Sequence, residues 1–137
     1  MLSAGQIATF VISGDVPSKK NSMGIAVRGN KPHTYKKAIL TNYEESFSYQ
    51  IPNEYKTENK KECQMVCMLY PKDNRKDTIN ALAIIADCLE QCRVIKNDRQ
   101  IIDARMLKIA VDKTNPRVKI IIKFLNEGGH NETKKRG

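Results

Sequence analysis

One segment, DTINALAIIADCLEQC at residues 77–92, constrains the fold more than any other part of the chain. Its apolar residues recur at helical intervals and form one stripe, made of Ile79, Leu82, Ala86 and Leu89. Asp77 is a typical N-cap for such a segment. A second edge of the same helix carries the small or polar residues Asn80, Ala83 and Asp87. The pattern therefore predicts an amphipathic helix over residues 77–92.

Apolar and β-branched runs on both sides of this helix predict a sheet. Residues 6–13 (QIATFVIS) carry apolar residues on both faces and are typical of a well-buried first strand. Residues 63–70 (CQMVCMLY) end before a proline and predict another strand. The runs at 101–111 and 117–125 are joined by the turn sequence DKTNP, so we expect them to pair as a hairpin.

The stretch between the first strand and residue 35 is a long loop. Its prolines, glycines and asparagines disfavour regular structure, and a short hairpin is expected only at 24–28. Loops of this length are commonly functional. Residues 35–50 then predict a second helix, with Thr34 as its N-cap and Pro52 just beyond its end.

Length and charge narrow the class of protein. The 137 residues fit one domain, since domains cluster near ~100–150 residues. The chain has neither an apolar run of the ~18 residues that a membrane span needs nor an N-terminal signal-peptide pattern, so a cytoplasmic location is expected. The net charge of +9 makes a polyanion the first partner to consider and an acidic membrane surface the second. Residues 16–37 hold six basic groups and no acidic one; ordinary solvated lysines are the alternative interpretation.

The four cysteines form two pairs at i, i+4 spacing, Cys63 with Cys67 and Cys88 with Cys92. This spacing formally fits a structural zinc site, and a zinc-stabilised regulatory protein is therefore one alternative. Cys63 and Cys67, however, lie in a strand-like run, where four residues span roughly 13 Å. Buried free thiols in a reducing compartment are the prediction.

Carboxylates are the best candidates for chemistry. The two histidines, His33 and His130, have no nearby nucleophile that would support covalent catalysis. Asp77 starts the predicted helix, Asp87 lies farther along it, and Asp98 follows in the turn KNDRQ. Mg²⁺ prefers oxygen ligands and needs only one or two protein carboxylates beside substrate phosphates, so this pattern indicates metal-dependent phosphodiester chemistry. The alternative is that Asp77 is only an N-cap and Asp98 only a turn residue.

The segments RKDTINALAIIADCL at 75–89 and VIKNDRQI at 94–101 resemble the RusA family of Holliday junction resolvases. That family reads Asp-x-Asp-Asn-x-x-Lys, then Asp-Ala-Leu on the same helix, then Asp-Asp-x-Gln before a strand. The spacing from Asp77 to Gln100 matches without a gap. Two further segments resemble the family's basic loop and closing strand, PSKKNS at 17–22 and PRVKI at 116–120.

The resemblance implies both a fold and an activity. It implies an α+β fold, a small mixed β-sheet with two main helices packed on it, forming one nuclease domain over residues 1–125. Residues 126–137 are polar and are expected to be a disordered tail. It also implies a homodimer that binds four-way or other branched DNA and cuts it with Mg²⁺, for which Mn²⁺ would substitute. The small size would suit a phage or prophage gene.

Carried over residue by residue, the resemblance makes Asp77 and Asp98 metal-binding catalytic carboxylates. Asp87 would complete the catalytic group, and Asn80 lies on the same helical edge. Contacts to the DNA backbone are expected from the basic loop and from the turns that flank the helix, through Lys19, Lys20, Asn21, Arg75, Lys76 and Arg99.

Three positions depart from the family pattern. The second motif Asp is Ile79, the motif Lys is Ala83, and the first member of the Asp-Asp pair is Asn97. Losing a carboxylate lowers the negative charge that holds a metal, and losing an ammonium group removes a cation that could stabilise charge on the phosphate. The alternative function is therefore a RusA-like protein that binds branched DNA without cutting it.

Overall fold

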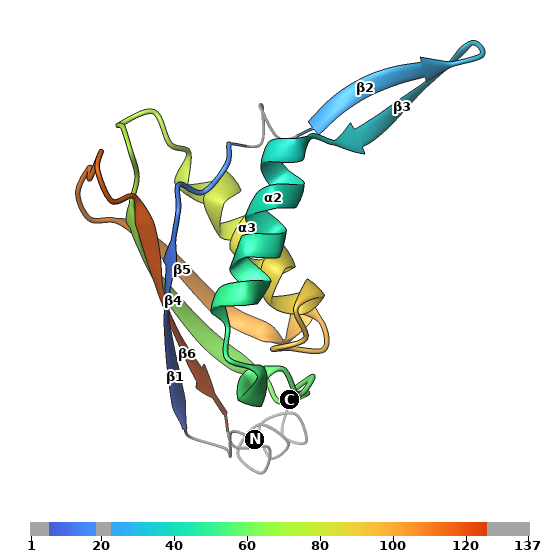
Figure 1. Cartoon of the computed structure of the whole chain (residues 1–137). Helices are drawn as coiled ribbons and strands as arrows, with labels where there is room; N and C mark the ends of the chain where they lie inside the picture. Colours follow the sequence, from blue (N-terminus) through green and yellow to red (C-terminus); the bar gives the residue numbers. More distant parts are fainter. Residues whose placement is uncertain (1–5, 19–22, 126–137) are drawn as a thin grey trace.

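The computed structural model describes residues 6–18 and 23–125 (Figure 1). The predicted tail at 126–137 lies outside these residues. In order, the elements are β1 Ile7–Ser13, β2 Met23–Arg28, β3 Lys31–Lys36, α2 Ala38–Gln50, the 3₁₀ turn η1 Asn53–Tyr55, β4 Cys63–Tyr70, α3 Thr78–Gln91, the 3₁₀ turn η2 Asp98–Gln100, β5 Ile101–Lys108 and β6 Arg117–Phe124. The predicted α+β class, with a mixed sheet and two main helices, is confirmed.

Four strands form the main sheet in the order β1-β6-β4-β5. β6 is antiparallel to both β1 and β4, whereas β5 is parallel to β4. α3 supplies the crossover that two parallel neighbours require. The predicted hairpin of residues 101–111 with 117–125 is wrong, because β4 lies between β5 and β6. Alternate residues of β6 are buried, which suits a central strand, while β5 is mostly exposed and takes the edge.

Both helices lie on the same face of the sheet and enclose the core with it (Figure 1). β1 contributes Ala8, Phe10 and Ile12, whereas its other face carries the exposed Ile7 and Val11. The strand is therefore buried on one face only, and the prediction of a well-buried strand is wrong for the other face. The reason is that, within residues 6–18 and 23–125, both helices lie on the first face and none covers the second (Figure 1).

The buried stripe of α3 differs from the predicted one. It consists of Ala81, Ile84, Ile85, Cys88 and Leu89, so only Leu89 is common to both stripes. The helix carries apolar residues on more than one side, and packing against both the sheet and α2 selects the side centred on Ile85. Ile79, a member of the predicted stripe, has 79% of its surface exposed.

α2 begins at Ala38 and not at residue 35, because residues 31–36 pair with β2 as strand β3. The expected short hairpin at 24–28 is thus longer and spans residues 23–36. Thr34 lies within β3, and Lys37 takes the N-cap position of α2 without a side-chain cap bond. The end of α2 is tied to β1, since the Gln50 amide accepts from and donates to the backbone of Ser13 at 2.8 and 3.1 Å.

All four cysteines are buried and free, as predicted for core thiols. Burial raises the pKa of Cys63 to about 11 and the pKa values of Cys67 and Cys88 to about 12. These thiols therefore remain protonated and serve as apolar core groups. Among the described residues, neither helix has the length and apolar character to cross a membrane.

Candidate active site

Asp77 caps the N-terminus of α3, as the sequence predicts. Its Oδ1 accepts hydrogen bonds from the backbone N–H groups of Ile79 at 2.9 Å and Asn80 at 3.3 Å, groups that a helix start leaves unpaired. Its Oδ2 accepts a further bond, at 3.0 Å, from the side-chain amide of Asn80. The structure thus brings the predicted site residues Asp77 and Asn80 together. A carboxylate offers about four lone-pair positions, which leaves Asp77 capacity for another contact.

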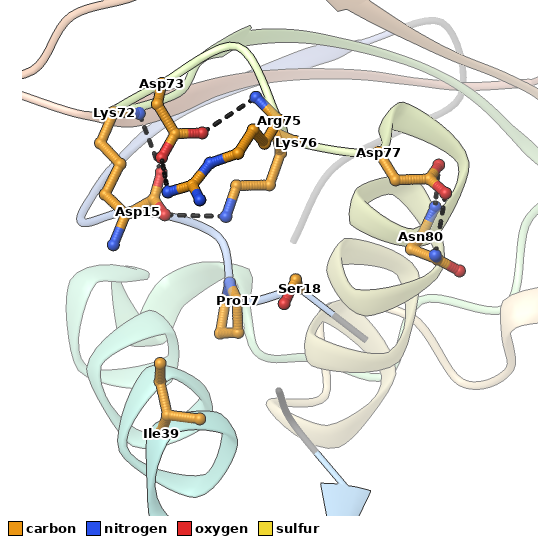
Figure 2. A pocket seen from close by; sticks show the side chains of 10 residues that line it. All are labelled: Asp15, Pro17, Ser18, Ile39, Lys72, Asp73, Arg75, Lys76, Asp77 and Asn80. Carbon is orange, nitrogen blue, oxygen red and sulfur yellow. Dashed lines mark hydrogen bonds and ion pairs between the residues drawn. The ribbon is translucent and has the colours of Figure 1, made fainter. Parts of the chain in front are cut away.

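A hollow of about 600 Å³ opens beside Asp77 (Figure 2). It lies between the segment that follows β1, the turn before α3 and the start of α2. Three cations line it, Lys72, Arg75 and Lys76. Figure 2 shows Asp77 and Asn80 on one side of this hollow and Asp15 with its partners on another.

The two predicted DNA-binding cations of this hollow differ in their surroundings. The Lys76 side chain is only 8% exposed and forms an ion pair with Asp15 at 2.8 Å, so it ties the segment after β1 to the start of α3. The side chain of Arg75 is 88% exposed and contacts Asp73 at 3.1 Å, and this hydrogen bond lowers the pKa of Asp73. An exposed ion pair is weak, so Arg75 is the freer of the two to contact a phosphate.

A second group of carboxylates lies toward the other end of α3. The backbone N–H of Asp98 donates to Oε1 of Glu90 at 2.8 Å, which holds η2 against the last turns of the helix. Partial burial and then the negative charges of Asp98 and Glu90 raise the pKa of Asp87, while Lys36 opposes this. The structure therefore brings Asp87 and Asp98 near each other, with a local excess of negative charge that a cation would relieve.

The two predicted metal ligands do not meet within one chain. Asp77 precedes Asp87 by ten residues, which is a rise of about 15 Å along the axis of α3. Asp98 belongs to the Asp87 end, as its bond to Glu90 shows. Within residues 6–18 and 23–125, no three His, Cys, Asp or Glu side chains gather into a ready metal site. In this structure α3 therefore holds Asp77 and Asp98 toward its opposite ends.

The turn that carries Asp98 is built by its neighbours. Asn97 accepts the backbone N–H of Arg99 at 2.9 Å, and the side chain of Gln100 accepts the N–H of Asn97 at 2.7 Å. The amide of Gln100 also donates to the carbonyl oxygens of Asn59 and Lys61 at 2.6 and 2.8 Å. Gln100 thus anchors the turn to the segment before β4. Arg99 is exposed, and its Nε lies 3.3 Å from Asn97.

A groove of about 380 Å³ runs beside the second edge of α3. Asn80, Ala83 and Asp87 line it together, which confirms that they share one helical edge. Lys36, at the end of β3, faces them across the groove and pairs with Glu44 of α2 at 2.9 Å. Sequence reasoning missed Lys36 because no local pattern links it to α3, and only the tertiary fold brings the hairpin to this edge.

Three predicted DNA contacts, Lys19, Lys20 and Asn21, lie outside the described residues.

A comparison with protein families shows which family most of the chain matches. A family model, that of the endodeoxyribonuclease RusA, matches residues 16–123. The chain belongs to the RusA family. No curated protein matches the chain.

The match to the RusA family spans β2 through most of β6, and so includes both helices and the carboxylates Asp77, Asp87 and Asp98. The departures from the RusA motif lie at positions where packing and helix capping do not require a particular residue. Ile79 and Ala83 are exposed on α3, and Asn97 is an N-cap for which Asp would serve equally. None of the three is therefore explained by a demand of the core.

Proposed function

We propose that this chain is a structure-specific endodeoxyribonuclease that cuts Holliday junctions or related branched DNA by Mg²⁺-dependent phosphodiester hydrolysis. The observation that carries the proposal is the family match over residues 16–123, which includes Asp77, Asp87 and Asp98. The net charge of +9 supports it, because a basic surface attracts the phosphate backbone whatever the base sequence. A cytoplasmic location and a phage or prophage origin are further predictions from the family.

The carboxylates of Asp87 and Asp98 are the oxygen ligands that we propose for a divalent cation. Asp87 and Asp98 crowd their negative charges at one end of α3, and Mg²⁺ needs only one or two protein carboxylates beside substrate phosphates. When bound, Mg²⁺ would polarise the phosphate and lower the pKa of an attacking water. Asp77 is proposed as a third catalytic carboxylate, acting at its own position about 15 Å away along the helix. Two exposed cations are proposed to contact the DNA backbone: Arg75 near Asp77, and Arg99 next to Asp98.

A homodimer is part of this proposal. A four-way junction has two-fold symmetry, and two coordinated cuts are most simply made by a two-fold symmetric protein. Each chain would then present one copy of α3 to one of the two strands to be cut.

The direct test is incubation of the purified protein with a labelled four-way junction in Mg²⁺, Mn²⁺ or EDTA, with binding and cleavage measured in the same samples. Paired nicks that depend on the metal are expected. A matched linear duplex serves as the control substrate. Absence of both binding and cleavage on every branched substrate would refute the proposal.

The second candidate is a protein that binds branched DNA without cutting it. Ile79 favours it, because an exposed apolar side chain stands next to Asp77 where the family has a carboxylate. Ala83 adds to this, because it leaves the groove without the motif ammonium group. Tight, salt-sensitive binding of junctions without nicks, at protein concentrations where binding is complete, would establish this candidate in place of the first.

A further inference from the structure

The β2–β3 hairpin, residues 23–36, projects from the body of the molecule beyond the start of α2 (Figure 1). All of its residues are exposed except Gly24. A two-stranded hairpin standing alone is only marginally stable in water. This one exposes Ile25 by 72% and Val27 by 69%, which is unusual for large apolar side chains on a protruding element.

The pairing register sorts the hairpin into two unlike faces. Residues directly opposite each other share a face. One face is largely apolar, with Met23 opposite Lys36, Ile25 opposite Thr34, and Val27 opposite Pro32. The other face is basic and aromatic, with Gly24 opposite Tyr35, Ala26 opposite His33, and Arg28 opposite Lys31. A side chain at Gly24 would clash with the Tyr35 ring, so this pair helps to fix the register.

The charge of the hairpin has one sign only. Residues 23–37 contain four basic groups and no acidic one, and they are Arg28, Lys31, Lys36 and Lys37. Arg28 and Lys31 form the last pair before the turn, so two cations stand at the tip. The whole chain carries +9, and a second copy of it would therefore meet this element with repulsion. Charge complementarity favours a polyanion as the partner.

The apolar face also continues from the candidate site. Met23 and Lys36, the pair at its base, line the groove together with Asn80, Ala83 and Asp87 of α3. Beyond that pair, the same face presents Ile25 and then Val27 outward toward the tip. A nucleic acid strand that occupied the groove would therefore meet this face next.

We propose that the β2–β3 hairpin is a DNA-binding arm, with Arg28 and Lys31 contacting phosphates and Ile25 and Val27 packing against bases at the branch point. The proposal rests on the proposed function, since it takes branched DNA as the ligand. A two-stranded β-ribbon is of a size that the major groove admits, and apolar side chains inserted between base steps are a known way to hold distorted DNA. A branch point exposes base faces that a continuous duplex stacks away, so the apolar face would select branched over linear DNA.

The charged tip is tested with the double variant R28A/K31A. Binding to a labelled four-way junction and to a linear duplex is measured in EDTA across a range of salt. We expect the slope of log Kd against log salt to fall by about two for both DNAs, and the affinity to drop about ten-fold. The matched control is K60A/K123A. It removes two exposed positive charges, one just before β4 and one at the end of β6, away from the hairpin, and should leave the slope nearly unchanged.

The apolar face is tested with I25S/V27S in the same assay. The preference for the junction over the duplex should fall about five-fold or more, while duplex binding stays close to the wild-type value. Thermal unfolding and sedimentation are measured alongside, and neither should change, because both side chains lie outside the core. If I25S/V27S changes the oligomeric state, the face belongs to a second copy of the chain and the arm proposal is overturned.

The outcomes separate the arm from the proposed function. If the wild-type protein binds junctions but R28A/K31A behaves like K60A/K123A, the arm is refuted and the nuclease proposal stands. If the wild-type protein binds neither DNA, both proposals are refuted together.

Discussion

The two ends of α3 carry carboxylates in opposite situations. Asp77 at the N-terminal end accepts three hydrogen bonds from the first turn and so caps the helix. Asp87 at the other end is exposed, but it loses part of its hydration and faces the negative charges of Asp98 and Glu90, and these effects raise its pKa. The cap bonds of Asp77 contribute to stability, whereas the ionised Asp87 reduces it. Loss of the cap bonds of Asp77 and loss of the charge of Asp87 should therefore change the stability of the protein in opposite directions, whatever they do to cleavage.

The largest effect is expected on cleavage, from Asp98→Asn and Asp77→Asn. Each change removes one negative charge while keeping the shape of the side chain and an oxygen acceptor. If each carboxylate stabilises the reacting phosphate or its metal by several kcal/mol, cleavage should fall at least about 100-fold. Junction binding in EDTA should persist for both variants. The measurement is single-turnover cleavage of a four-way junction in Mg²⁺.

These two variants also test whether the carboxylates at both ends of α3 take part in cleavage. Cleavage that survives Asp77→Asn would remove Asp77 from the mechanism and leave it as a helix cap. Cleavage that survives Asp98→Asn would show that the crowded carboxylates are not part of the site.

The next effect is on stability, from Asp77→Ala compared with Asp77→Asn. Alanine removes the cap bonds to the backbone of Ile79 and Asn80, and losing such a cap costs about 1 kcal/mol. For a domain of this size the Tm should fall by about 3–6 °C. Asparagine is an equally good N-cap, so Asp77→Asn should melt close to the wild-type temperature. Equal melting of all three proteins would show that the cap bonds do not stabilise α3.

The comparison also shows what the sequence alone could and could not predict. β4 and the start of α3 follow from local patterns: a proline ends the strand, and Asp77 has the chemistry of a cap. The pairing of 101–111 with 117–125 failed because a turn sequence reports a change of direction and not which strand lies next to which. β4, nearly forty residues earlier in the chain, takes the place between them.

The sequence predicts which residues belong to the candidate site better than it predicts how they are arranged in space. The spacing from Asp77 to Asp98 identifies the motif, but it does not show that α3 holds the two carboxylates apart. Asp87 lies on the helical edge that the spacing predicts, together with Asn80 and Ala83, and its part in the site stays a prediction. Lys36 could not be found in advance, because it reaches the groove from a hairpin whose extent depends on pairing between β2 and β3.

A smaller effect, of opposite sign, is expected from Asp87→Asn. Because the folded-state pKa of Asp87 lies above its ordinary value, the ionised group costs stability at neutral pH, and this cost disappears as the pH falls below the ordinary carboxylate range. Asp87 is exposed and water screens the repulsion, so in EDTA at pH 7 the variant should melt above the wild type by no more than about 1 °C. The difference should shrink on acidification toward pH 4. A lower Tm at pH 7 would mean that contacts of the carboxylate outweigh its repulsion.

The smallest effect on stability is expected from Asn97→Asp, which restores the family residue. Asp caps a helical turn as well as Asn does, so the bond from the N–H of Arg99 should persist and the stability should change by less than about 0.5 kcal/mol. The added negative charge stands next to Asp98, however, and should strengthen cation binding at that end of α3. The Mg²⁺ concentration for half-maximal cleavage should therefore fall in Asn97→Asp at constant ionic strength, while Asn80→Asp, beside Asp77, provides the matched control at the other end. An equal shift in both variants would show that the metal responds to the total charge of the helix and not to the carboxylates near Asp98.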